Sequence, residues 1–421
     1  MGLAGAVHHL TVHNGLLSAG RSGCLFLLAL ILELHTAKVN IQIMDILAAD
    51  ANKICEIFTK MDGFFVLASQ FANIWYLKIF WEELETARKR RFTNAAVSVT
   101  IVAQSRRGGH PHMKDLQKKL RVALVQATPV MFNKDATIDK VCAQIREAGK
   151  NGAELIVFPE SLIPCYPYGL TYGFTVGSRT EECRDDWKIY YDNAVLCPSE
   201  DTDRIGAAAK EAGAYVSIGY TERGRNNGTL YCANMIFGPD GRLLCNHRKL
   251  KPTGAERIVW GDADKDYFPT VDSPWGTMGA LICWENYMPL ARVALYQKGV
   301  SLYLCPNTNN NPEWHDTIKH IAIEGKCFVF HVNQYFTRDM YPSDYHGPAA
   351  DEIARLPEAP CNGGSAIIDP YGHYVTEPVW DCETIIYADI DPDQAARARM
   401  EFDPCGHYSR PDVTELIVHE K

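Results

Sequence analysis

Leu120-Arg-Val-Ala-Leu-Val-Gln126 is the stretch of sequence that decides the fold class. Its aliphatic and β-branched residues predict a strand. Apolar residues then recur with helical spacing over residues 135–149, and Glu154-Leu-Ile-Val-Phe158 predicts a second strand. A strand, a helix and a strand in this order indicate an α/β protein, in which helices cover a sheet.

The alternation of strands and helices continues beyond residue 200. Residues 202–213 and 289–298 have the pattern of helices, and residues 215–220, 278–282, 301–305 and 328–333 have that of strands. Two further pairs of strands flank tight turns: residues 230–237 and 243–247 lie around Gly238-Pro-Asp-Gly241, and residues 364–368 and 385–390 lie around Asp369-Pro-Tyr-Gly372. We therefore expect a layered α/β fold with a mixed sheet.

The chain divides near residue 113. Residues 1–112 lack regular alternation and carry 11 Lys and Arg against 8 Asp and Glu, whereas residues 113–421 carry 31 against 43. The segment Ser105-Arg-Arg-Gly-Gly-His-Pro-His112 is typical of a linker. We predict an irregular N-terminal extension over residues 1–112, outside a catalytic domain that spans residues 113–421. The extension serves targeting or partner contact, or else Met113 is the functional start; we favour the second interpretation.

Composition argues against several classes of function. A net charge of −9 disfavours nucleic acid as a partner, because phosphate binding needs a basic face. The 14 cysteines contain no CxxC pair and the chain has no HExxH, so we expect no metal site. Scattered cysteines are typical of a reducing compartment, which predicts a cytoplasmic protein. The apolar run from Cys24 to Leu32 is shorter than the about 20 residues of a membrane-spanning helix, so no membrane partner is expected.

Polar residues that a purely structural strand does not need follow three of the predicted strands. Glu160 comes shortly after residues 154–158, Lys249 after residues 243–247, and Cys283 directly after residues 278–282. Sites in α/β proteins gather at such carboxyl ends of strands. We therefore expect a carboxylate, an ammonium and a thiol to meet in one hydrolytic site. Taken singly, each also has a structural interpretation, as a helix-capping acid, a solvated cation and a buried thiol.

The segments around these residues resemble three signatures of the nitrilase branch of the carbon–nitrogen hydrolases. They are Phe158-Pro-Glu160, His247-Arg-Lys-Leu-Lys-Pro-Thr253 and Cys283-Trp-Glu-Asn-Tyr-Met-Pro-Leu290. Four more segments resemble further blocks of the same branch. They are Ile163-Pro-Cys-Tyr-Pro-Tyr-Gly169, Glu256-Arg-Ile-Val-Trp-Gly261, His320-Ile-Ala-Ile-Glu-Gly325 and Gly406-His-Tyr-Ser-Arg-Pro-Asp412. One triplet alone would be weak, but these blocks occur in order from about residue 118 to residue 415.

The resemblance carries expectations about fold, site and assembly. It implies an α-β-β-α sandwich that dimerises, so we expect a homodimer or a higher homo-oligomer. It also implies a triad of Glu160, Lys249 and Cys283, with Glu256 as a fourth polar residue that positions the lysine and the incoming group. No metal and no organic cofactor are implied.

These residue types suit the hydrolysis of a nitrile. A nitrile carbon is a poor electrophile, and a thiolate is the best nucleophile among the side chains. Glu160 has to take the proton of Cys283, while Lys249 and a helix N-terminus after the cysteine favour the anion. Attack gives a thioimidate whose nitrogen gathers negative charge, where Lys249 donates. Two waters then release ammonia and the carboxylic acid through a thioester.

The residues around the signatures indicate the substrate class. The run Trp284-Glu-Asn resembles nitrilases and cyanide-degrading enzymes, whereas Tyr-Met-Pro-Leu-Ala-Arg292 is closer to hydrolases of organic nitriles. Tyr166 and Trp284 are candidate walls of the substrate pocket, and Tyr168 and Tyr172 add aromatic character that would suit an aryl or arylaliphatic nitrile. We predict hydrolysis of a small organic nitrile. The alternatives are a cyanide hydratase or dihydratase, an amide or carbamoyl hydrolase, and an idle assembly module, which would require a broken triad.

Overall fold

The computed structural model describes residues 119–309 and 311–419. The extension over residues 1–112, with the apolar run from Cys24 to Leu32, lies outside the described residues, so the boundary near Met113 stays a prediction. Within the described part, no helix is both long enough and apolar enough to cross a membrane.

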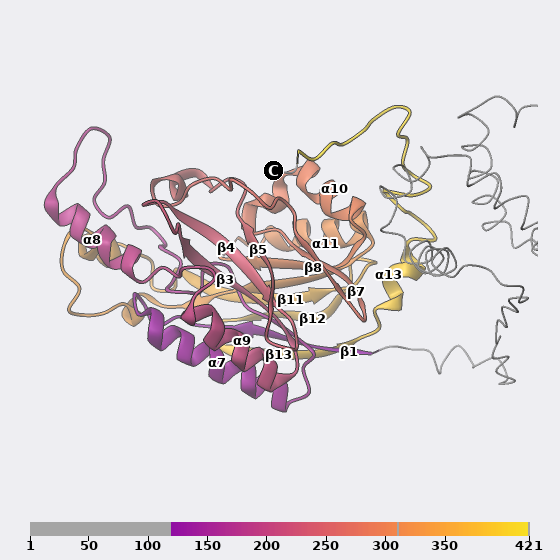
Figure 1. The fold of residues 1–421 in the computed structure, drawn as a ribbon, viewed down its shortest axis with the longest axis horizontal. Helices are drawn as coiled ribbons and strands as arrows, with labels where there is room; N and C mark the ends of the chain where they lie inside the picture. The colour runs from indigo at the N-terminus through magenta and orange to yellow at the C-terminus, as the bar shows by residue number, and fades with distance from the viewer. Residues whose placement is uncertain (1–118, 310, 420–421) are drawn as a thin grey trace, which may run out of the picture. The chain divides into compact units, whose positions relative to one another are not determined.

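Two β-sheets form the centre of the protein (Figure 1). The strands of the first sheet are β1 (Leu120–Gln126), β2 (Leu155–Val157), β3 (Tyr215–Arg223), β4 (Leu230–Phe237), β5 (Leu243–Arg248) and β13 (Thr384–Ile390). Those of the second are β6 (Thr270–Ser273), β7 (Gly276–Ala280), β8 (Val300–Asn307), β9 (Phe328–Asn333), β10 (Tyr335–Phe336), β11 (Cys361–Ile368) and β12 (Tyr374–Trp380). The strand orders are β13-β1-β2-β3-β4-β5 and β10-β11-β9-β8-β7-β6, with β12 paired to β11.

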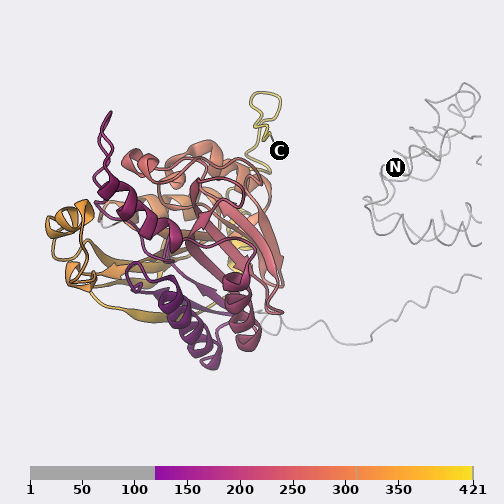
Figure 2. The ribbon, with the colours of Figure 1, turned by 60° about the vertical axis from the view of Figure 1, so that its left-hand side comes forward.

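Helices cover the outer face of each sheet, as Figure 1 and the turned view of Figure 2 show. The helices are α7 (Lys134–Lys150) and α9 (Glu200–Ala212) on the first sheet, α10 (Pro289–Gln297) and α11 (Trp314–Gly325) on the second, and α8 (Glu181–Asp192), α12 (Pro348–Ala354) and α13 (Asp393–Ala398) elsewhere. Short 3₁₀ turns are η2 (Gly254–Ile258), η3 (Cys283–Tyr287) and η4 (Arg338–Met340). The expected α-β-β-α sandwich is confirmed.

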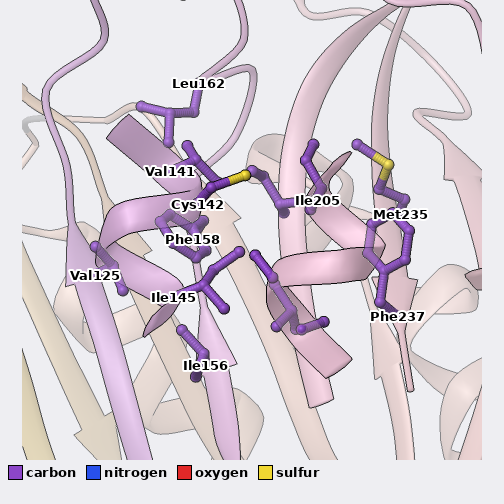
Figure 3. Close-up of a cluster of buried hydrophobic side chains, with 14 of the residues drawn as sticks. Val125, Val141, Cys142, Ile145, Ile156, Phe158, Leu162, Ile205, Met235 and Phe237 are labelled. Carbon is purple, nitrogen blue, oxygen red and sulfur yellow. The ribbon is translucent and has the colours of Figure 1, made fainter. Parts of the chain in front are cut away.

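The side chains of β1 alternate between two apolar layers, which is why the strand is buried on both faces. Val125 packs in the layer between the first sheet and its helices, together with Ile145 of α7 and Ile205 of α9 (Figure 3). Leu124 points the other way, into the layer between the two sheets, which it shares with Phe330 of β9. The apolar run at residues 122–125 therefore marks a strand that lies between two apolar layers of a four-layer protein.

Sequence and structure agree on the elements that carry regular apolar patterns. The strands expected at residues 120–126, 230–237 and 328–333 are observed with these bounds, and the helix expected at residues 135–149 is one residue longer at each end. One expectation was wrong. The turn Asp369–Gly372 leads into β12 rather than into the strand at residues 385–390, and β13 pairs with β1. Pro378 and the irregular register of β12 hide this strand from a search for alternation.

A chain that starts at Met113 should fold and keep the activity of the full chain. The reason is that β1 already pairs with β13 on one side and with β2 on the other, within the catalytic domain. The measurement is solubility, thermal unfolding and nitrile hydrolysis of both chains. Insolubility or inactivity of the shorter chain alone would show that residues 1–112 are structural.

Candidate active site

Glu160, Lys249 and Cys283 come from two different sheets. Glu160 follows β2 and Lys249 follows β5 in the first sheet, whereas Cys283 follows β7 in the second. The ends of β2 and β5 are not adjacent, because β3 and β4 lie between these two strands in the sheet. The long side chain of Lys249 bridges this separation, with Nζ 2.7 Å from Glu160 Oε1. All three side chains are buried.

Lys249 lies between two carboxylates. Its Nζ donates to Glu160 Oε1 and, over 2.9 Å, to Oε2 of Glu256. Burial by itself would lower the pKa of this ammonium, but Glu160, the Cys283 sulfur and Glu256 together raise it well above its ordinary value. Lys249 is therefore a permanent cation at the centre of the site.

Glu160 is a buried acid with a free acceptor atom. Burial, opposed by Lys249 and reinforced by Glu256, raises the pKa of its carboxyl group. While Oε1 accepts from Lys249 and, over 3.4 Å, from the thiol of Cys232, Oε2 has no hydrogen-bond partner among the described residues. A raised pKa and an unoccupied oxygen are what a general base needs.

Glu256 joins the site to Tyr166, which the sequence marked as a pocket wall. Its Oε2 accepts from the backbone N–H of Thr253 as well as from Lys249, and this cap holds η2 in place. Its Oε1 accepts from the Tyr166 hydroxyl over 2.7 Å. The ring of Tyr166 lies edge-on to Trp260 and packs against the apolar cluster that contains Cys283. Tyr166 thus presents its apolar body beside the nucleophile and fixes a carboxylate of the site.

The backbone of Cys283 has a strained conformation in the turn that follows β7. Its φ is 50°, a left-handed conformation that costs a non-glycine residue about 1 kcal/mol. Burial and Glu160 raise the pKa of the thiol, whereas Lys249 and the backbone N–H of Thr308, which donates to the sulfur, favour the thiolate. The expected helix N-terminus after the cysteine is only the 3₁₀ turn η3, and α10 begins at Pro289.

Asn286 holds the nucleophile turn together. Its amide nitrogen donates to the carbonyl oxygens of Leu281 and Cys283, over 2.9 and 2.7 Å, and its Oδ1 accepts from the Tyr303 hydroxyl. Its own carbonyl oxygen accepts from Arg292, which pairs with Glu324. The polar residues after the cysteine therefore stabilise a strained turn.

Trp284, a candidate pocket wall from the sequence, lies at the surface in this structure. Its side chain is 48% exposed, and its ring packs edge-on against Tyr287, which in turn contacts Trp314 of α11. It is absent from the apolar cluster around Cys283, which includes Tyr166 and Tyr168. A role for Trp284 as a pocket wall stays a prediction.

Three further residues of the site were not found from the sequence. Cys232 reaches Glu160 from β4, and Gln334 donates to the Glu160 carbonyl oxygen over 2.6 Å. Gly219 of β3 lies so close that a Cβ there would be 2.3 Å from the Pro159 carbonyl oxygen and 2.6 Å from Glu160 Cα. Each comes from a segment distant in sequence and stands in no recognisable motif, so only the fold reveals it.

Within residues 119–309 and 311–419, no group of three or more His, Cys, Asp or Glu side chains is arranged to hold an ion. Glu160 and Glu256 instead both pair with the ammonium of Lys249. The arrangement can remove a proton from a thiol and hold a developing negative charge.

The sequence is similar to a family of hydrolases and to several of its members. The family profile of the carbon–nitrogen hydrolases matches residues 121–400. An aliphatic nitrilase of Sinorhizobium fredii is 46% identical over 304 residues, which are 72% of this chain and 96% of the relative. Nitrilase 1 of Arabidopsis thaliana is 42% identical over 303 residues, 72% of this chain and 87% of the relative.

Solved structures share the fold at lower identity. A carbon–nitrogen hydrolase from Helicobacter pylori aligns with a TM-score of 0.55 at 18% identity, over 70% of this chain and 97% of that one. Nit3 of Saccharomyces cerevisiae, a member of the nitrilase superfamily, aligns with a TM-score of 0.53 at 23% identity, over 69% of this chain and 97% of that one.

The electrostatic arrangement predicts how Cys283 reacts with an alkylating agent. Because Lys249 lowers the pKa of the Cys283 thiol, replacing it in Lys249→Met should move the pH midpoint of Cys283 alkylation by iodoacetamide upward. The matched control is Lys251→Met, since Lys251 is exposed and pairs with Asp262. Peptide mass spectrometry identifies the labelled cysteine. An unchanged midpoint in Lys249→Met, or an equal shift in both variants, would contradict this electrostatic account.

Proposed function

The chain belongs to the carbon–nitrogen hydrolase family, and we propose that it hydrolyses a small organic nitrile to the carboxylic acid and ammonia. The observation that carries the proposal is the buried Lys249, held by Glu160 and Glu256 and acting electrostatically on the Cys283 sulfur. The names of relatives at 46% and 42% identity support the nitrile as the substrate class.

The first half of the reaction forms a bond between sulfur and carbon. Glu160 accepts the proton of Cys283, so the net charge of the buried cluster does not change. The sulfur attacks the nitrile carbon while Lys249 stabilises the negative charge that develops on nitrogen. The proton held by Glu160 then passes to this nitrogen, which gives a neutral thioimidate and restores the Glu160 carboxylate. The unoccupied Glu160 Oε2 and the donor position of Lys249 support these roles.

The second half of the reaction consumes two waters. Glu160 deprotonates the first water, which adds to the thioimidate carbon and gives a tetrahedral intermediate. Expulsion of ammonia leaves a thioester, and a second water hydrolyses it to the carboxylic acid and the free thiol. If the tetrahedral intermediate instead loses the sulfur, the product is an amide. Some relatives named bifunctional nitrilase/nitrile hydratase, at 40% identity, make this branch worth measuring.

The alternative substrates differ in the size of the group beside the reacting carbon. Tyr166 and Tyr168 pack against the cluster around Cys283, together with the buried Phe336. Such an aromatic wall suits an apolar group larger than the hydrogen of cyanide, which favours an organic nitrile. Amide and carbamoyl hydrolysis use the same triad and are tested by the same assay.

We also propose that the protein forms homodimers or larger homo-oligomers. The support is a run of exposed apolar side chains next to the site, Trp284, Tyr287 and Leu290, of which Leu290 on α10 is 66% exposed. Exposed apolar patches of this kind mark protein interfaces. The cytoplasmic location expected from the cysteines stays a prediction.

Replacing the nucleophile should abolish turnover without unfolding the protein. Cys283→Ala and Cys283→Ser remove the thiolate, and neither side chain can attack a nitrile at neutral pH. The measurement is formation of ammonia and of amide from aliphatic and arylaliphatic nitriles, the matching amides and cyanide, with circular dichroism as the control for folding. Near-normal turnover by folded Cys283→Ala would remove the proposal, and faster conversion of amides or of cyanide, the latter to formamide or to formate and ammonia, by the unaltered protein would favour the alternatives.

A further inference from the structure

Glu285, two residues after the nucleophile, makes contacts that no step of the proposed reaction uses. Its side chain is 1% exposed. Oε2 accepts from the backbone N–H of Ile282 over 2.6 Å, and Oε1 accepts from the backbone N–H of Leu250 over 2.7 Å. Ile282 directly precedes Cys283, and Leu250 directly follows Lys249. One carboxylate therefore bonds the chain next to the nucleophile and the chain next to the cation.

The two bonded segments belong to different sheets. Lys249 and Leu250 follow β5, the edge strand of the first sheet, whereas Ile282 follows β7 of the second. No β-ladder joins β5 to β7, and most of the side chains between the two sheets are apolar. A hydrogen-bonded bridge supplies the directional constraint that apolar packing lacks.

Of the two backbone hydrogen bonds that Glu285 accepts, only the one from Ile282 stabilises the turn η3. A carboxylate three residues into a helical turn ordinarily caps the first N–H, and the bond to Ile282 is such a cap. The bond to Leu250 lies outside the turn and satisfies no group of η3. It links residues 35 positions apart in the sequence.

His247 fixes the same carboxylate from the first sheet. It lies on β5, is 2% exposed, and its Nε2 donates to Glu285, 3.0 Å from Oε2 and 3.2 Å from Oε1. Three donors, two of them from the strand end that carries Lys249, therefore surround Glu285. Groups from both sheets therefore fix the rotamer of Glu285.

We propose that Glu285 is a positioning residue, which with His247 sets the placement of Lys249 relative to the Cys283 sulfur. The role in turnover rests on the proposed function, because it concerns the charge that Lys249 stabilises during attack. A displacement of about 1 Å between catalytic groups costs on the order of 100-fold in rate. Glu285 itself touches neither the substrate nor the reacting atoms.

The test is Glu285→Gln, which keeps the volume but turns one acceptor oxygen into a donor that faces a backbone N–H. We expect kcat to fall by about 100-fold while KM changes little. The pH midpoint of Cys283 alkylation should also move upward, because Lys249 no longer sits in place to lower the thiol pKa. The alkylation needs no nitrile, so it reports on positioning even if the substrate class is wrong.

Glu222→Gln is the matched control. Glu222 is also a buried carboxylate beside β5, 3% exposed, and it accepts from the side chains of Asn246 and of Arg248, the residue before Lys249, but from no backbone N–H next to Lys249 or Cys283. Its replacement should lower the melting temperature yet leave kcat and the alkylation midpoint close to those of the unaltered protein. If Glu285→Gln only lowers the melting temperature, as Glu222→Gln does, Glu285 is merely structural.

His247 provides a second test in case Glu285→Gln does not fold. Gln at this position can donate an N–H from nearly the place of Nε2, whereas Leu cannot. His247→Gln should therefore preserve the alkylation midpoint, and His247→Leu should shift it in the direction given for Glu285→Gln. Equal midpoints in His247→Gln and His247→Leu would overturn the part of the proposal that concerns His247, and unaltered kcat and midpoint in folded Glu285→Gln would overturn all of it.

Discussion

A buried ammonium held between two carboxylates is the interaction on which the rest of the site depends. Removing a charge from water costs several kcal/mol, and only well-placed partners repay it. Lys249 has both Glu160 and Glu256 within 2.9 Å. Removing one partner of such a group typically costs about 3–5 kcal/mol. The cluster is therefore either assembled completely or strongly destabilised, and we propose that its assembly makes the thiol at this position reactive.

The same cluster explains why the proton can move. Burial raises the pKa of both Glu160 and Cys283, so neither group ionises independently of its neighbours. Lys249 favours one negative charge on either group, and a proton passed from sulfur to carboxylate leaves the total charge as it was. The fold contributes the geometry. Gly219 lets β3 approach the segment of Glu160, and the left-handed turn at Cys283, tied by Asn286, presents the sulfur.

The sequence predicted the strands, the helices and the residues of the site better than it predicted which strands pair with each other. Apolar periodicity located β1, β4, β9 and α7, because these elements are buried and carry no turn residues. The signatures around Glu160, Lys249, Cys283 and Glu256 predicted residues that the structure brings together. Three features could not be predicted. The pairing of β1 with β13 joins segments far apart in the sequence, the strand β12 is obscured by Pro378, and Cys232 meets Glu160 only after folding.

The central claim is that the buried cluster makes the sulfur of Cys283 the atom that bonds to a nitrile carbon. Two thiols, Cys283 and Cys232, lie in this cluster, and Cys232 is 3.4 Å from Glu160. The most direct measurement is peptide mass spectrometry of the protein acid-quenched during turnover of 3-phenylpropionitrile. The account predicts an acyl or imidoyl adduct on the peptide that contains Cys283, and none on that peptide in Glu160→Gln. An adduct on Cys232, or acid formation with no thiol adduct at all, would contradict it.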